Sequence, residues 1–108
     1  MKTIYRYEIN QAINDVTLPV GAKILSVGIS TDWKYSSVDP YDLVDDTKTQ
    51  IETISMWALV DNDAGVETRR FLMFGTGADM SAIETYNLDF IGTVQKSNQY
   101  AFHVFEVK

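Results

Sequence analysis

The stretch ISMWALVD-NDAG-VETRRFLMFGTG, residues 54–77, decides the fold. In the first half, Ile54, Met56, Ala58 and Val60 recur at every second position, which is the period of β-strands. The turn-forming residues 62–65 separate the halves, so the sequence predicts two long strands, Ile51–Asp61 and Glu67–Phe74, joined as a hairpin. Gly65 is placed for a backbone conformation with positive φ. The first strand is apolar on both faces, which predicts a central position or a cover on both sides.

The same alternation predicts further strands on either side of this stretch. They are Lys2–Glu8, Thr17–Val20, Ala22–Thr31, Phe90–Gln95 and Tyr100–Val107. The last two form a hairpin across residues 96–98. Asn14 and Asp15 predict a turn, and Gly28 within its strand indicates a bulge or a close backbone approach.

Two segments interrupt the alternation. Asp39 followed by Pro40 is typical of a helix start, so we expect an acidic loop with one short helix within residues 33–49. Residues 80–86 predict another short helical turn with Ser81 as its cap. The chain is thus expected to be a single all-β domain, residues 1–108, with six or seven antiparallel strands forming a small barrel or a sandwich, plus one or two short helices. Trp57, Phe71, Phe74, Phe102 and Phe105 are expected in its core.

Composition excludes several classes of protein. The 108 residues carry 9 basic and 15 acidic side chains, a net charge of −6, which does not suit general nucleic-acid binding. No cysteine is present, so disulfides and thiolate metal sites are excluded. No apolar run approaches the roughly 20 residues that span a bilayer, and the mixed charges of residues 2–8 do not form a secretory signal. We therefore expect a cytoplasmic protein without membrane contact.

Seven blocks of sequence together resemble a family of short, uncharacterised proteins encoded by bacteriophages and prophages. The blocks are KTIYRYE (2–8), LPVGAKILSV (18–27), MWALVD (56–61), ETRRF (67–71), GTG (75–77), GTVQ (92–95) and FHVFE (102–106). The resemblance implies an accessory protein that acts in the cytoplasm of an infected bacterium, and it carries no known activity or catalytic residues. Against that family, residues 33–49 have the character of an insertion.

Arg69 and Arg70 are the first candidate binding residues. Consecutive strand residues point to opposite faces, so the two side chains do not reach one pocket unless a bulge intervenes. If Phe71 faces the core, so does Arg69, which then needs a carboxylate from Glu67, Glu52 or Glu106. Arg70 is left free to grip a phosphate or carboxylate. Structural ion pairing and anion recognition both remain open for the pair.

Gly75, Thr76 and Gly77 are the second candidate, as a nest of backbone N–H groups that binds an anion. A dinucleotide fingerprint would need a third glycine and a helix, so a plain turn is the competing interpretation. His103, the single histidine, lies between Phe102 and Val104 and is expected to be buried with one hydrogen bond; no partner for catalysis is evident.

The remaining candidates lie in or near the acidic segment. Trp33 and Tyr35 flank it and are the aromatic residues best placed for an interface. Asp39, Asp42, Asp45 and Asp46 lack the glycine and terminal glutamate of a calcium loop, so no metal or cofactor is expected.

These residues support three hypotheses. The first is a non-enzymatic binding protein, used in host takeover or counter-defence, that sequesters a small nucleotide-like anion or blocks a host protein, with homo-oligomerisation open. The second is a minor virion or assembly protein. The third is a small hydrolase centred on His103 or on carboxylates.

Overall fold

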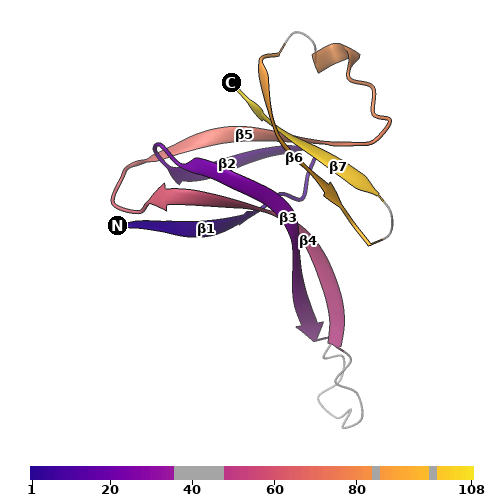
Figure 1. Ribbon diagram of the computed structural model, residues 1–108, viewed down its shortest axis with the longest axis horizontal. Coiled ribbons are helices and arrows are strands. Elements are labelled where there is room, and N and C mark those ends of the chain that lie inside the picture. The colour runs from indigo at the N-terminus through magenta and orange to yellow at the C-terminus, as the bar shows by residue number, and fades with distance from the viewer. Residues whose placement is uncertain (36–47, 84–85, 98–99) are drawn as a thin grey trace.

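The computed structural model describes residues 1–35, 48–83, 86–97 and 100–108, and these form an all-β domain (Figure 1). Its elements are β1 Lys2–Glu8, β2 Ile13–Pro19, β3 Lys23–Tyr35, β4 Lys48–Asp61, β5 Val66–Gly75, the single 3₁₀ turn η1 Ser81–Ile83, β6 Leu88–Gln95 and β7 Ala101–Val107. The all-β prediction is confirmed, and the strand count among the described residues lies within the predicted range.

The strands form two antiparallel sheets. Sheet A has the order β1-β4-β3, and sheet B has the order β2-β5-β7-β6. No hydrogen-bonded ladder joins the sheets in the described part of the chain, so the arrangement is an open sandwich rather than a closed barrel. The two sheets approach closely between β3 and β6, where a Cβ added to Gly92 would lie 2.8 Å from Cγ2 of Val27. This position tolerates only glycine without displacement of a neighbouring side chain.

The core lies between the facing sides of the two sheets. Its members with at most 1% exposure are Ile9, Leu18, Met56, Ala58, Val60, Phe71 and Val104. Alternation along β4 explains a large part of this set, because every second residue from Ile54 to Val60 is buried. The prediction that this strand is central is confirmed, since β4 pairs with β1 on one edge and β3 on the other.

The predicted hairpin between β4 and β5 is wrong. Both edges of β4 are already paired, so β5 crosses to sheet B and pairs with β2 and β7. The residues that reverse the chain are the predicted ones, with the Ala64 amide donating to the Asp61 carbonyl at 3.1 Å. Turn residues encode a reversal of direction, but not which sheet the next strand joins. Gly65 does not have positive φ; Gly21 (79°) and Gly77 (90°) do.

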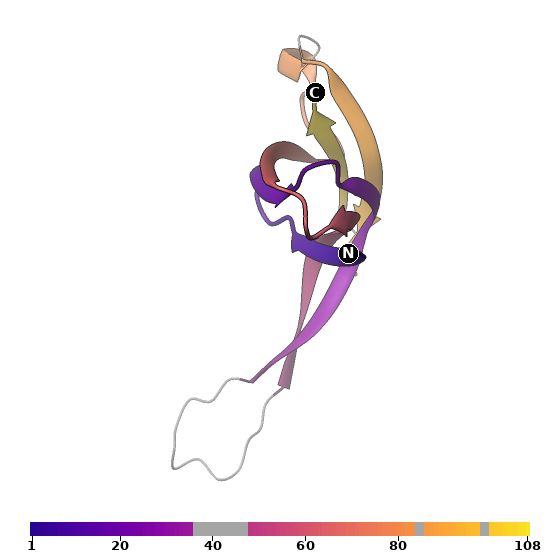
Figure 2. The ribbon, with the colours of Figure 1, turned by 90° about the vertical axis from the view of Figure 1, so that its left-hand side faces the viewer.

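The β3–β4 ribbon is longer than expected and extends beyond the rest of the molecule (Figures 1 and 2). Its backbone pairs Trp33 with Gln50 and Tyr35 with Lys48, so the expected loop at 33–49 is strand at both ends. The pairing of β3 with β4 continues beyond the rest of sheet A because the two strands keep the same register as far as Tyr35 and Lys48. The predicted helix start at Asp39 and the acidic residues at 42, 45 and 46 lie outside the described residues.

Three local predictions also need correction. Asn14 and Asp15 are within β2 rather than in a turn; the turn precedes them, and Asn14 stabilises it by accepting from the amide of Gln11 at 3.1 Å. The bulge in β3 lies between Ile24 and Ser26, whereas Gly28 provides room for the Trp57 ring, because a Cβ added there would lie 3.3 Å from that ring. The η1 turn is capped by Asp79, which accepts from the Ser81 amide at 2.9 Å.

Among the described residues, no helix is long and apolar enough to cross a membrane.

Candidate functional site

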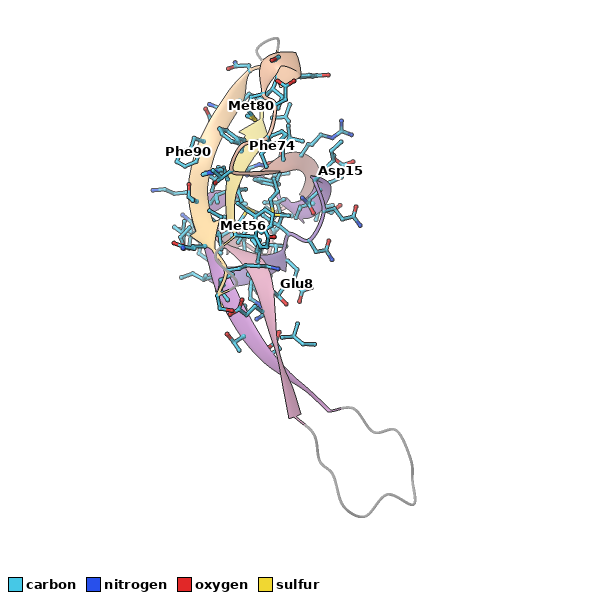
Figure 3. The ribbon with its side chains drawn as sticks, turned by 90° about the vertical axis from the view of Figure 1, so that its right-hand side faces the viewer. Glu8, Asp15, Met56, Phe74, Met80 and Phe90 are labelled. Atoms are coloured by element: carbon cyan, nitrogen blue, oxygen red, sulfur yellow. The ribbon has the colours of Figure 1, made fainter. Side chains whose placement is uncertain are left out.

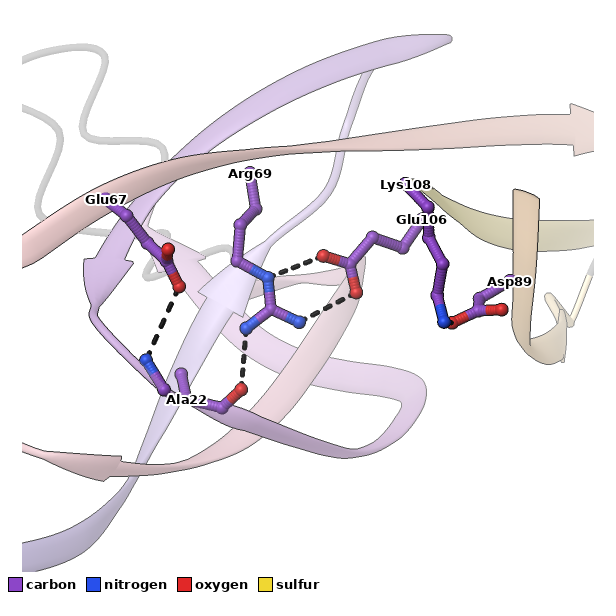
Figure 4. A network of polar contacts seen from close by, with 7 residues as sticks. Ala22, Glu67, Arg69, Asp89, Glu106 and Lys108 are labelled. Atoms are coloured by element: carbon purple, nitrogen blue, oxygen red, sulfur yellow. Dashed lines mark hydrogen bonds and ion pairs between the residues drawn. The ribbon is translucent and has the colours of Figure 1, made fainter. Parts of the chain in front are cut away.

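Arg69, on the inner face of sheet B, joins β5 to β7 and to the connection between β2 and β3. Its Nε and Nη2 atoms donate to the Glu106 carboxylate at 2.5 and 2.7 Å, and its Nη1 donates to the carbonyl of Ala22 at 2.6 Å (Figure 4). The predicted need for a carboxylate is confirmed, with Glu106 as the partner. Of the other candidates, Glu67 accepts weakly from the Gly21 amide at 3.4 Å, and Glu52 accepts from the Ser97 amide at 3.2 Å.

Arg70 points to the outer face of sheet B, as alternation requires, but the prediction that it is free is wrong. Its Nε and Nη2 donate to the Asp15 carboxylate at 2.8 and 3.2 Å. Asp15 stands directly opposite Arg70 in the β2–β5 register. The error follows from the assignment of Asp15 to a turn, which removed it from the strand that faces Arg70.

The electrostatics of the two arginines differ in kind. The hydrogen bond to Glu106 raises the pKa of Arg69, whose side chain is only 20% exposed. The hydrogen bond from Arg70 lowers the pKa of Asp15, but both of these side chains are at least half exposed, so water screens the pair. Arg69 therefore has a structural role. The ion pair of Arg70 with Asp15, by contrast, can be replaced by another contact at a small cost in free energy.

Gly75, Thr76, Gly77 and His103 do come together, at the end of β5. The His103 ring is held between two threonine hydroxyls, with Thr76 Oγ1 2.9 Å from Nε2 and Thr93 Oγ1 2.9 Å from Nδ1. His103 is half-buried and has two hydrogen bonds, where full burial and one hydrogen bond were expected. The Thr76 amide donates to the Ala101 carbonyl, so one of the expected anion-binding N–H groups is occupied, and the Ala78 amide next to them donates to the Gly75 carbonyl.

A cavity of about 200 Å³ lies beside His103, with Phe74, Phe105, Met80 and the Gly75–Ala78 turn in its wall. Figure 3 shows Phe74 and Met80 at this end of the molecule. Threonine next to histidine has the spacing of a nucleophile and a base. The group that orients the ring is, however, a neutral hydroxyl, where a hydrolytic triad uses a carboxylate or amide.

The outer face of sheet B is the main feature that sequence reasoning missed. Phe74 and Phe105 were expected in the core, but they lie on this face with Phe90, in ring contacts at centroid distances of 6.0 and 5.3 Å. Phe90 is 59% exposed and stands on the outside of β6 (Figure 3). The other apolar residues of the face are Ile13, Leu72 and Val107. Period-two patterning does not reveal which of two apolar faces is covered.

A further cavity, of about 380 Å³, lies at the mouth between the sheets. Its walls combine apolar and charged residues: Glu8, Ile9, Asn10, Glu52, Thr53, Ile54, Met73, Lys96 and Phe102. Lys96 lies 5.8 Å from the Phe102 ring centroid, and the Ser97 hydrogen bonds lower the pKa of Glu52. These residues come from distant segments of the chain, so no sequence motif predicts this cavity.

The remaining candidates are separate from this face. Trp33 and Tyr35 lie on the backbone of the β3–β4 ribbon, which belongs to sheet A, and their side chains are outside the described set. In the described ranges, no group of three or more His, Asp or Glu side chains has the arrangement of a metal site.

The fold and these sites define a small, open, antiparallel β-sandwich with an apolar outer sheet face. The chain belongs to the family described as "Domain of unknown function (DUF7352)", whose family model matches residues 1–108. No curated protein and no solved structure shows significant similarity to it.

Proposed function

We propose that this chain is a non-enzymatic binding protein that docks on another protein through the outer face of sheet B. The observation that carries the proposal is the exposure of large apolar side chains on that face, with Phe90 at 59% and Ile13 at 56%. The two residues lie on the opposite edge strands of sheet B, and large apolar side chains exposed on one face favour an interaction site in a soluble protein. Tyr86, 61% exposed, adds a residue type that is enriched in interfaces.

The dimensions of the face suit a protein partner. Four strands about 4.8 Å apart, each with about six residues rising about 3.3 Å, present roughly 400 Å² in projection. A standard interface buries about 800 Å² on each partner, with an apolar centre and a polar rim. The face has this anatomy, because Arg70 and Asp15 form a charged pair beside Ile13 and Leu72.

Charge favours a partner other than a second copy. The chain carries a net charge of −6, so two copies repel each other at long range, whereas a neutral or basic protein is not repelled. The resemblance to phage and prophage proteins supports a host protein as this partner, with host takeover or counter-defence in the bacterial cytoplasm as the role. A minor virion or assembly protein is the alternative, and detection of the chain in purified particles would favour it.

A hydrolytic role has less support. The His103 ring is oriented by Thr93, and the amide of Thr76 next to it donates to the Ala101 carbonyl. Neither a charged orienting group nor a pair of free N–H donors for an oxyanion accompanies the ring among the described residues. Replacement of His103 by Gln is therefore expected to leave partner binding intact.

The test is native mass spectrometry of the tagged protein purified gently from bacterial lysate. We expect one partner protein at fixed stoichiometry, retained by a Leu59→Asp control on sheet A and lost with Phe90→Asp. Both positions are exposed, so neither change should unfold the domain. A homodimer that Phe90→Asp dissociates would show that the face binds a second copy, and capture of the same proteins by both variants would exclude the face altogether.

A further inference from the structure

Another cavity on the outer face of sheet B lies next to Arg70. Its volume is about 310 Å³, and its lining residues are Ala12, Ile13, Arg70, Leu72, Phe74, Ile83, Tyr86 and Val107. Small-molecule sites occupy about 300–1,000 Å³ and combine mainly apolar walls with a few polar groups. In this cavity, seven wall residues provide apolar or aromatic surface and one provides a cation.

The cavity is built from two layers. Its floor is the β2–β5–β7 part of the sheet, where Ile13 pairs with Leu72 and Leu72 pairs with Phe105. Its opposite side comes from the segment after β5, with Ile83 at the end of η1 and Tyr86 beyond it. Leu72 is 9% exposed although it lies on the outer face, and it shares the cavity wall with Ile83 and Tyr86.

Arg70 retains hydrogen-bonding capacity toward the cavity. A guanidinium has five N–H donors on three nitrogens. The Nε and Nη2 atoms donate to Asp15, whereas Nη1 donates to none of the described residues. Because Asp15 is half exposed and water screens the ion pair, a ligand anion can share the guanidinium with it.

The mouth cavity and the cavity at His103 do not have this combination. The mouth cavity has Glu8, Glu52 and Lys96 in its wall, so charges of both signs compete there. The cavity at His103 is smaller, about 200 Å³, and has no lysine or arginine in its wall. Of these three cavities, only the one at Arg70 joins an apolar wall to a single cation.

We propose that this cavity binds a small amphipathic carboxylate, with its apolar body against Leu72, Phe74 and Ile83 and its carboxylate on Nη1 of Arg70. The apolar wall supplies the affinity through burial of the ligand chain, and the guanidinium selects an acid over an alcohol or an amine. This site shares Ile13, Leu72 and Tyr86 with the proposed docking face and goes beyond it, because ligand binding depends on Arg70 whereas docking depends on the exposed Phe90 of β6.

The experiment is a titration of ¹⁵N-labelled full-length protein with octanoate, followed by NMR. We expect shifts of the Ile13, Leu72 and Ile83 amides, and an affinity for octanoate about tenfold higher than for octan-1-ol, since a hydrogen bond to a charged group contributes about that much. Octylammonium should bind more weakly than the alcohol. Arg70→Gln should reduce octanoate affinity about tenfold and leave octan-1-ol affinity unchanged.

The matched control is Arg6→Gln, which removes another exposed arginine, bonded to Ser30 on sheet A. It should change neither affinity. Equal binding of octanoate and octan-1-ol, an unaltered octanoate affinity in Arg70→Gln, or shifts confined to residues of the mouth cavity would each overturn the proposal. Phe90→Asp separates the two proposals, because it should abolish partner capture and leave octanoate binding in place.

Discussion

Arg69 and Arg70 are neighbours in the chain and have opposite environments. Arg69 is 20% exposed and joins Glu106 on β7 to the Ala22 carbonyl in the connection between β2 and β3, whereas Arg70 is 55% exposed and pairs with Asp15 on the adjacent strand. Both make bidentate contacts with a carboxylate, so the geometry of the ion pair does not distinguish them. Burial distinguishes the two arginines, because it sets the free-energy cost of leaving a charge unpaired.

The same contrast holds for the two faces of sheet B. The inner face is closed against sheet A with Phe71 and Val104 fully buried, while the outer face exposes Phe90. Substitutions on the inner face should therefore change stability, and substitutions on the outer face should change binding. The following predictions test this division.

The largest effect is expected for Arg69→Ala. It leaves Glu106 unpaired at 14% exposure and removes the donor from the Ala22 carbonyl, so the free energy of unfolding should fall by about 3 kcal/mol. Urea denaturation measures this. The double variant Arg69→Met with Glu106→Leu should be more stable than the single variant, because no buried charge remains. A single variant as stable as the wild type would show that this ion pair is not structural.

The next effect is expected at the approach of β3 to β6. Gly92→Ala places a methyl group 2.8 Å from Cγ2 of Val27, a stiff β-branched side chain, and should cost about 2 kcal/mol. Gly65→Ala is the control, since nothing lies within 4 Å of its added Cβ and its φ is not positive. Comparison of the two urea midpoints gives the result; equal midpoints would mean that the sheets separate easily here.

A small effect on stability is expected for Arg70→Ala. The pair with Asp15 is exposed and screened, so the melting temperature should stay close to that of the wild type, as followed by circular dichroism. Unfolding of this variant would place Arg70 with Arg69 among the structural residues, and would remove it from any ligand site.

The smallest effect is expected for the pH dependence of folding stability that comes from Asp15. The hydrogen bond from Arg70 lowers the pKa of Asp15 in the folded protein below its ordinary value. A lowered carboxyl pKa stabilises the fold above the unfolded pKa of about 3.9, and this contribution is lost as the pH falls through the folded value. Carboxyl NMR of Asp15 should show a higher titration midpoint in Arg70→Ala than in the wild type. An unchanged midpoint would mean that the pair does not persist in solution.

Much of the inner architecture was predictable because it depends on local periodicity. Alternation from Ile54 to Val60 placed every second residue on one face of a strand, which is the buried face, and the expected carboxylate partner of Arg69 is Glu106. The β6–β7 hairpin was predicted with nearly its observed limits. Asp15 was misplaced because Asn and Asp are typical of turns, and here the pairing of β2 with β5 outweighs that preference.

The sequence by itself determined the β-strand class and the opposite directions of Arg69 and Arg70, since both follow from a two-residue repeat. For β4 it left a central position or a cover on both sides open, and the pairing with β1 and β3 decided between them. Only the tertiary structure decided that β4 and β5 belong to different sheets, and that Phe74 and Phe105 lie on an outer face. The physical reason is that alternation fixes which residues share a face, whereas the covering of that face depends on contacts between segments far apart in the chain.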